Sequence, residues 1–454
     1  MPSLFSTADA PVESHKRLYI RSESVKSGEI LLEIPVRRDS RDHRSLEMLA
    51  HYLNTAAPGG LLHALQSELG WITGGGFLTT VFENRVHFRF YYELTNEGMA
   101  RGEDVNAMFF AALKATREYG PSEEFLAAKK TDLLKDFIRA GFSVDSFMDI
   151  YGQILASGKD VGTQVNEMLG TRTIDLRHAA GLLRPDMALY TEMGPEIPDM
   201  EFHPVYPREF KLLDNRAALK RYEDALNSPP PRKFRPELRA VDLGPAPSTP
   251  IEKMFAQSRP LPHLRERLTL DLRTDLPDTA AEIRLETAAR TPRSRVAWEI
   301  LLTAFFDRFR GETTHLEMYY HVRIAATGDG NHLLLSSSGD DAYASRALAW
   351  LAERLAEFQP SALEFARAKE SFIASHRQEA SSEFSAMAAV NETWADLDPL
   401  AYTHAQAVEI AENLDAGTTY ALWREAIARS RKSYTMVGAL PPRTWTCSAA
   451  RPGV

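Results

Sequence analysis

The sequence has 454 residues, of which 44% are hydrophobic, so it can form two or three domains with buried cores. The net charge of −9 argues against nucleic-acid binding, because proteins of that class normally carry a basic face. The single cysteine, Cys447, excludes a disulfide framework and a cysteine-rich metal cluster. No apolar stretch approaches the ~20 residues that cross a membrane, and no basic and apolar leader opens the chain, so we expect a cytoplasmic protein.

The first half of the chain predicts strands, a helix, further strands and then several helices. Its expected elements are strands at 18–20 and 30–34, helices at 46–53 and 61–69, a strand at 81–94, helices from 105 to 183 and a strand at 187–193. The strand at 81–94 is the clearest, since apolar and polar residues alternate along it. We expect it to be central in its sheet, with Phe88 and Phe90 on the buried face.

The second half repeats this order. Its expected elements are strands at 268–272 and 283–285, a helix at 296–305, strands at 320–324 and 333–338, helices from 344 onward and a strand at 434–440. Glu282–Glu286 (EIRLE) echoes Glu29–Glu33 (EILLE). A repeat of about 240 residues has the size of a domain. The pattern predicts an α+β fold of two homologous two-layer α/β sandwich domains, with antiparallel-rich sheets and helices on one face.

Prolines are concentrated between the two halves, at 227–262. Because proline lacks a backbone donor and fixes φ, we expect an extended and semi-rigid linker there. The expected boundaries are a flexible N-terminus at 1–16, a domain at 17–226, the linker at 227–262, a second domain at 263–440 and a flexible tail at 441–454.

No complete catalytic motif is found in the sequence. His-Glu-x-x-His and His-x-x-Glu-His, which place two zinc-binding imidazoles on one helix face, are both absent. The nearest fragments begin at His263 and His376, and each lacks the second histidine that zinc requires. His315 and His321 fall in a predicted strand region, at a spacing that specifies no metal. We therefore assign no catalytic residue, no metal ligand and no cofactor to this chain.

Residues 49–71, LAHYLNTAAPGGLLHALQSELGW, resemble the second domain of the insulysin/pitrilysin (insulinase, inverzincin) metallopeptidases. Members of that family carry Gly-Pro-Gly-Ser-Leu and then a leucine-rich run that ends in Gly-Trp. They continue to Leu-Thr-x-x-Gly, which matches Leu94–Gly98. The second half of the chain resembles the third domain of the same enzymes, so the resemblance covers nearly the whole sequence.

The resemblance implies a non-catalytic role, because the zinc motif of these four-domain enzymes lies in the first domain. Zinc is then expected only in a catalytic partner. Arg310 with Tyr319 or Tyr320 could imitate an Arg/Tyr pair of the fourth domain, but the order of motifs matches the third.

The family also implies a place where peptides bind, since its second domain offers a sheet edge to the substrate. The corresponding residues here are Gly59, Thr73, Gly74, Gly75, Gly76 and Phe77. Glycines in a strand often mark close approach by another backbone, and the alternative is a bulge or turn that binds nothing. We expect Gly75→Val to obstruct docking with little effect on the fold.

Two classes of function remain open from the sequence. The first is a chamber-forming, peptide-binding part or subunit of a zinc metallopeptidase, whose separate partner chain carries the zinc motif. The second is a degenerate scaffold or interaction protein, or a truncated gene product, with no proteolytic role. A peptide substrate is the expected partner in the first class, and neither class needs nucleic acid or a membrane.

Overall fold

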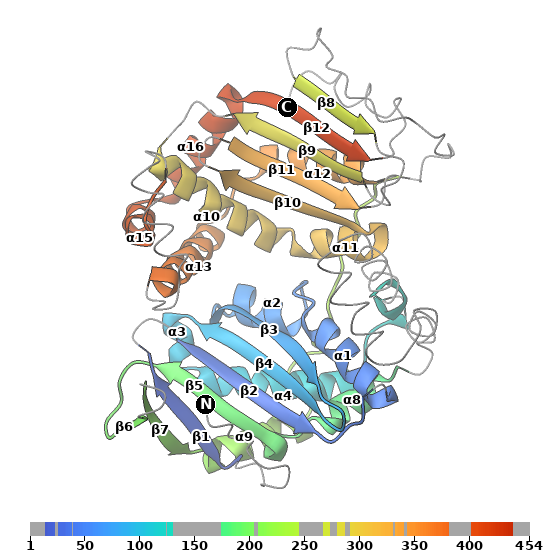
Figure 1. Ribbon diagram of the computed structural model, residues 1–454, viewed down its shortest axis with the longest axis vertical. Coiled ribbons are helices and arrows are strands. Elements are labelled where there is room, and N and C mark those ends of the chain that lie inside the picture. Colours follow the sequence, from blue (N-terminus) through green and yellow to red (C-terminus); the bar gives the residue numbers. More distant parts are fainter. Residues whose placement is uncertain are drawn as a thin grey trace. The chain divides into compact units, whose positions relative to one another are not determined.

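The computed structural model describes residues 14–22, 26–38, 40–123, 125–129, 174–203, 208–244, 267–272, 279–286, 291–329, 332–339, 343–380 and 401–438. These residues form two compact units (Figure 1). The first unit takes its residues from Met1–Leu126 and Gly170–Glu237, and the second from Ala127–Leu169 and Leu238–Val454. The domain boundaries at 17–226 and 263–440 stay a prediction.

The first unit contains a seven-stranded sheet with the order β3-β4-β2-β5-β1-β7-β6. The strands are β1 Lys16–Arg21, β2 Ser27–Ile34, β3 Ile72–Val81, β4 Val86–Leu94, β5 Ala188–Gly194, β6 Glu201–His203 and β7 Arg208–Asp214. β1 and β5 are parallel, and the other neighbouring strands are antiparallel.

The prediction of a single strand at 81–94 in the centre of the sheet is wrong in two respects, the residue at which the strand begins and its position in the sheet. The chain turns after β3, where the Phe82 N–H donates to the Arg85 C=O over 2.8 Å, and β4 begins at Val86. β4 lies between β3 and β2, second from the edge of the sheet. The predicted buried face is confirmed, since Phe88 and Phe90 have no exposed surface.

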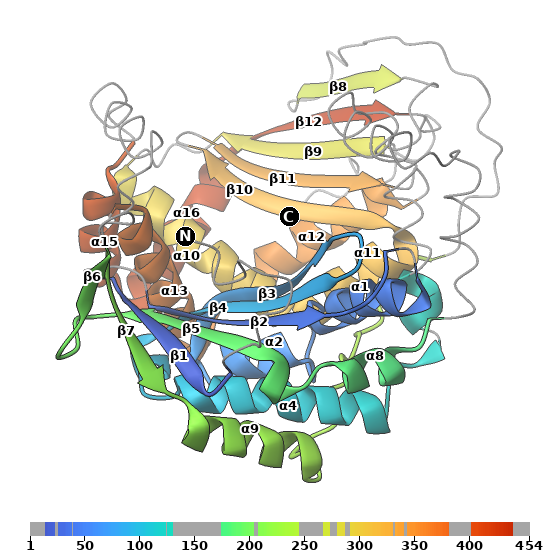
Figure 2. The ribbon, with the colours of Figure 1, turned by 60° about the horizontal axis from the view of Figure 1, so that its bottom comes forward.

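Helices cover one face of this sheet (Figure 2). They are α1 Arg41–Leu53, α2 Leu61–His63, the π-helix η1 Ala64–Glu68, α3 Asn96–Met99, α4 Gly102–Glu118, α8 Leu176–Leu182, the 3-10 helix η3 Pro185–Met187 and α9 Arg216–Asn227. α1 begins at a cap that the sequence provides, because the Ser40 hydroxyl accepts from the His43 N–H. Between the layers, Phe77 stacks on Phe90 at 4.6 Å, and Phe109 of α4 lies 5.2 Å from Phe90.

The second unit contains a five-stranded sheet with the order β10-β11-β9-β12-β8. The strands are β8 Arg267–Leu272, β9 Thr279–Glu286, β10 Val322–Asp329, β11 His332–Gly339 and β12 Arg431–Gly438. This order is that of β3-β4-β2-β5-β1 in the first unit, and β12 is again parallel to β8. The two halves therefore repeat one topology.

Helices also cover one face of the second sheet (Figure 2). They are α10 Pro292–Arg308, α11 Arg310–Tyr320, α12 Ala344–Glu357, α13 Ala362–Ala380, α15 His404–Glu412 and α16 Ala416–Arg429. Trp298, Phe305 and Trp423 are buried with Leu335 of β11 in its core. The α+β prediction of two-layer sandwiches is confirmed in both units.

The strand region predicted around His315 and His321 is partly wrong. His315 lies in α11, which runs to Tyr320, and the strand begins only at Val322. His321 joins the two in a left-handed conformation with φ 53°. The apolar residues at 320, 322 and 324 alternate as in a strand, although the first of them ends a helix. Periodicity alone does not mark where that helix ends.

The proline-rich stretch is described up to residue 244, and hydrogen bonds connect each part of it to the unit in which it lies. In the first unit, the Tyr52 hydroxyl donates to the Phe234 C=O over 3.3 Å, and the Glu237 N–H donates to Pro58 over 2.6 Å. In the second unit, the Val241 N–H donates to His315 Nδ1 over 3.3 Å. Residues 245–262 fall outside the described residues, so the extended linker at 227–262 stays a prediction.

Candidate functional site

The candidate site is the free edge of β3. Among the described residues, β3 is the last strand of the first unit's sheet and pairs with β4 alone (Figure 1). Backbone groups alternate in direction along a strand, and the hairpin closes with Phe82 bonded to Arg85. The even-numbered residues 74–80 therefore direct their N–H and C=O groups at β4. Residues 75, 77 and 79 direct theirs at the free edge.

The three glycines of this edge have different surroundings. None adopts a left-handed φ, so none is required for backbone conformation. A Cβ on Gly74 would meet nothing within 4 Å, whereas one on Gly75 would lie 2.7 Å from the Tyr91 backbone oxygen of β4. The substitution Gly75→Val would therefore displace β4, contrary to our expectation of little effect on the fold. Gly74 is the position at which a side chain can be added freely.

Phe77 does not offer its backbone or its side chain to a ligand. Its ring is 1% exposed and belongs to the core. Its backbone is held by the side chain of Asn54, the residue that ends α1. Asn54 Oδ1 accepts from the Phe77 N–H over 2.7 Å, and Asn54 Nδ2 donates to the Phe77 C=O over 2.7 Å.

Thr73 lies at an irregularity in the ladder. The register of β3 against β4 shifts between Ile72 and Gly74, which leaves Thr73 as the extra residue of a β-bulge. Gln66 Nε2, from η1, donates to the Thr73 C=O over 2.6 Å. The Thr73 hydroxyl donates to Glu93 Oε2 over 3.4 Å.

Gly59 lies in the turn between α1 and α2, against the linker. Its φ is +81°, and a Cβ would come within 2.4 Å of the Arg235 backbone oxygen. Glycine is required here because of its positive φ and because of the close approach of Arg235. The surroundings of Gly59 give it a role in docking residues 235–237.

Asn54 and Gln66 are the residues of this edge that sequence reasoning missed. Asn54 follows directly on the helical pattern at 46–53, a usual place for a helix-ending asparagine. Its contact with Phe77 spans 23 positions, and no local pattern encodes such a contact.

Residues 3–133 match a family model described as the peptidase M16 inactive domain. This match places residues 3–133 in the M16 (insulinase) peptidase family. The resemblance drawn from residues 49–98 is thereby confirmed, and it identifies a non-catalytic part of such peptidases. No curated protein matches the sequence significantly.

Solved structures of peptidases resemble this chain. A crystal structure of pitrilysin matches 96% of this chain and 47% of its own, with a TM-score of 0.56 and 14% identity. A mutant of the ferredoxin protease FusC in complex with Arabidopsis ferredoxin matches 96% of this chain and 50% of its own, with a TM-score of 0.46 and 11% identity. The periplasmic protease PqqL from Escherichia coli matches 97% of this chain and 51% of its own, with a TM-score of 0.35 and 13% identity. This chain therefore spans about half the length of each, and the pitrilysin match shows a shared fold.

The histidine fragments of the sequence do not assemble a metal centre in the described ranges. No three His, Cys, Asp or Glu side chains that could hold a metal gather there. His376 of α13 faces His404 of α15, with 2.9 Å between the two Nδ1 atoms. His263 lies outside the described residues, and the absence of a cofactor from this chain stays a prediction. None of the described helices is long and apolar enough to cross a membrane.

Arg310 and the two tyrosines lie at opposite ends of α11. Arg310 pairs with Asp307, Tyr319 stacks on His315, and the Tyr320 hydroxyl accepts from the Leu243 N–H over 3.4 Å. A helix rises about 1.5 Å per residue, so these ends are about 14 Å apart. They do not form one substrate-positioning pair.

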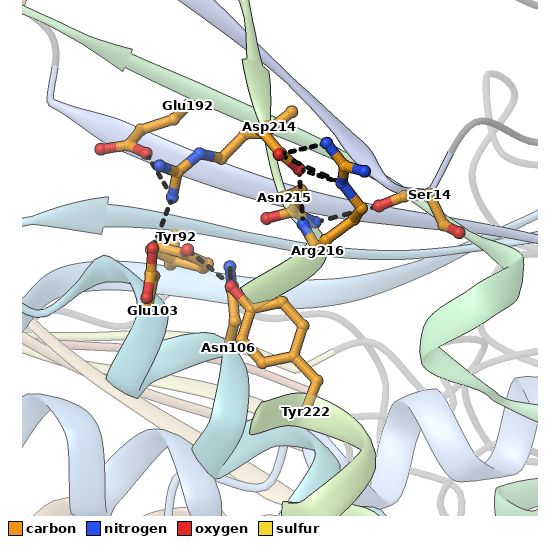
Figure 3. Close-up of polar contacts among 10 residues, drawn as sticks. Ser14, Tyr92, Glu103, Asn106, Glu192, Asp214, Asn215, Arg216 and Tyr222 are labelled. Atoms are coloured by element: carbon orange, nitrogen blue, oxygen red, sulfur yellow. Dashed lines mark hydrogen bonds and ion pairs between the residues drawn. The ribbon is translucent and has the colours of Figure 1, made fainter. Parts of the chain in front are cut away.

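A buried polar cluster underlies the first unit's sheet (Figure 3). The Tyr92 hydroxyl donates to Asn106 Oδ1 over 2.7 Å, and Asn106 Nδ2 donates to the Tyr222 hydroxyl over 3.1 Å. Burial raises the pKa of the Glu192 carboxyl, and the Arg17 guanidinium 3.2 Å away opposes this rise. The bonds among Tyr92, Asn106 and Tyr222 join β4, α4 and α9, which is a structural role.

Proposed function

We propose that this chain is a peptide-binding, chamber-forming part of an M16 metallopeptidase and that β3 is its peptide-docking edge. The observation that carries the proposal is an edge strand, inside an inactive M16 domain, with an outward-facing backbone at Gly75. Within the described part of the chain, no partner bonds the outward N–H and C=O of Gly75. An extended peptide can pair with such groups as an added strand.

The surroundings of the glycines suit a peptide of varied sequence. Gly74 leaves open space on the sheet face that is not covered by helices. Leu78 and Tyr91 lie on the same face, with 48% and 37% of their surface exposed. Main-chain hydrogen bonds would supply affinity without selecting one residue type in the peptide.

Peptide cleavage would need zinc from elsewhere. The printed sequence contains no His-x-x-Glu-His, so a separate chain or domain with that motif would activate the water. Capture from the native host with this chain as bait, followed by a cleavage assay with added zinc, tests for such a partner. If no chain with the zinc motif is captured, the scaffold interpretation is favoured.

The docking edge is tested by adding one large side chain to it. In Gly74→Trp the ring projects from the open face beside the position that an added strand would occupy, so we expect at least tenfold weaker binding of a fluorescent unstructured peptide. Thr80→Trp is the matched control, since Thr80 is exposed on the same strand and face. Both variants should melt like the wild type. Equal binding by all three proteins would rule out this edge.

A further inference from the structure

Two side-chain amides close the edge of β3 on either side of Gly75. Asn54 bonds both backbone groups of Phe77, and Gln66 bonds the C=O of Thr73. The two amides come from separate helical segments, the end of α1 and η1. Between them, the outward N–H and C=O of Gly75 form what we call the Gly75 window.

Asn54 takes the place of one residue of a neighbouring strand. A carboxamide carries one acceptor oxygen and a donor nitrogen, the same pair that a strand residue presents. At Phe77 both are used, over 2.7 Å each. A strand that continued along β3 past Gly75 would therefore have to displace Asn54 first.

Gly76 makes room for this arrangement. A Cβ on Gly76 would lie 3.1 Å from Asn54 Oδ1 and 3.0 Å from the Tyr91 hydroxyl, both tighter than ordinary contact. The backbone of Asn54 is held in turn, because its N–H donates to the Ala50 C=O of α1 over 2.9 Å. The helix therefore positions the Asn54 amide, and the missing side chain of Gly76 leaves space for it. The Asn54 side chain is exposed, so it can rotate away from Phe77.

We propose that Asn54 is a specificity-determining residue that ends an added strand at the Gly75 window. This inference rests on the proposed docking of peptides at β3. The ligand class is then a short extended segment or the end of a chain, because a long continuous strand gains nothing beyond Gly75 unless Asn54 leaves. Gln66 limits the same strand on the Thr73 side.

Hydrogen–deuterium exchange tests the position of Asn54 without any peptide. We expect the amide of Phe77 to be protected in the wild type and to exchange at least tenfold faster in Asn54→Ala. Asn413→Ala is the matched control, since Asn413 also ends a helix and its side-chain amide donates to the Glu409 C=O of that same helix. Fast exchange of Phe77 in the wild type would overturn the inference.

Peptide length tests the consequence. We expect wild type to bind a four-residue and a ten-residue unstructured peptide equally well. Asn54→Ala should favour the long peptide by about fivefold, the value of one net hydrogen bond. Asn54→Asp keeps the acceptor for the Phe77 N–H and loses the donor, so its preference should be intermediate. That variant also keeps the test open if Asn54→Ala folds poorly.

The outcomes separate the two proposals. If Asn54→Ala and Asn54→Asp show no length preference while Gly74→Trp still abolishes binding, Asn54 is not a specificity residue and the docking edge stands. If no protein binds either peptide, the docking edge and the role of Asn54 both fail.

Discussion

β3 and β10 occupy the same place in two sheets of the same topology, yet their edges are built differently. Strand pairing aligns Phe77 with Phe90 and Ile30 in the first unit, and Ala326 with Leu335 and Ile283 in the second. The register then places Arg323, Ile324 and Ala325 where β3 has Gly74, Gly75 and Gly76. Charged side chains on edge strands discourage pairing with another chain, and Arg323 is held by Glu317 at 3.0 Å.

The helices that precede the two edge strands also end differently, one in a polar residue and the other in an aromatic residue. α1 ends at Asn54, whose amide reaches β3. α10 ends at Phe309, whose ring packs against Phe305 at 4.8 Å and Phe358 at 6.3 Å. The repeat thus preserves strand order, while the residues at each helix end decide whether the neighbouring edge carries polar groups or an aromatic core contact.

The largest expected effect concerns the core behind each edge. Phe90→Ala should lower the free energy of unfolding by roughly 3–5 kcal/mol, and Leu335→Ala by roughly 2–5 kcal/mol, because both remove fully packed side chains. Denaturation of the full chain, with hydrogen exchange to locate the loss, measures both. Thr80→Ala on the exposed face is the control and should cost little. An unchanged first unit in Phe90→Ala would contradict the assigned core.

The sequence predicted the repeat because hydrophobic periodicity and turn residues are local signals. EILLE and EIRLE do become the equivalent strands β2 and β9. The helix end at Tyr320 was missed because His321 adopts a left-handed φ that no residue type announces there. The β6–β7 hairpin was missed as well, since β6 is only three residues long.

The candidate site could be predicted only as a segment. Glycines at 74–76 pointed to close backbone approach, and the structure gives each glycine different neighbours. Which backbone groups face outward depends on the bulge at Thr73 and on the register with β4, and both are set by tertiary pairing. The amide of Asn54 at Phe77 likewise depends on how α1 lies against the sheet.

The next largest effect is expected on peptide binding. It is tested by exchanging the residues that β3 and β10 carry at one equivalent position. Gly74→Arg gives β3 the residue that β10 has, and we expect at least a tenfold loss of peptide affinity, measured by fluorescence anisotropy. Arg323→Gly, the reciprocal change, should leave affinity unchanged because Ile324 and Ala325 remain. If Gly74→Arg binds normally at both low and high salt, the open face beside Gly74 has no part in docking.

A smaller effect is expected at the third glycine. Replacing a glycine by alanine in a strand usually stabilises by about 0.4–1 kcal/mol where the backbone allows it. Gly76→Ala should instead lower stability by about 1 kcal/mol, because the new Cβ would push Asn54 from Phe77 and lose hydrogen bonds. Ala325→Gly in β10 is the counterpart and should cost only the usual 0.5–1 kcal/mol of backbone entropy. A more stable Gly76→Ala protein with slow exchange at Phe77 would contradict the close fit of Asn54.

The smallest effect is on the pH dependence of stability, and the two units should respond with opposite signs. In the first unit, burial raises the pKa of Glu192 above its ordinary value of 4.5. The native state then binds this proton more tightly than the unfolded state, so stability falls as pH rises from 4.5 through the native pKa. In the second unit, the hydrogen bond from Arg308 lowers the pKa of Glu364 to about 2. The unfolded state binds that proton more tightly, so this contribution is lost as pH falls from 4.5 through about 2.

Two glutamine variants separate these contributions. Glu192→Gln should flatten the fall in stability of the first unit above pH 4.5, since the neutral amide does not ionise. Glu364→Gln should flatten the loss in the second unit below pH 4.5, by less than about 1 kcal/mol, because a partly exposed ion pair is screened by solvent. Denaturation between pH 2 and 8, resolved by hydrogen exchange in each unit, measures both slopes. The same sign of change in the two variants would mean that burial does not dominate at Glu192, and that Arg17, 3.2 Å from it, holds the carboxylate as Arg308 holds Glu364.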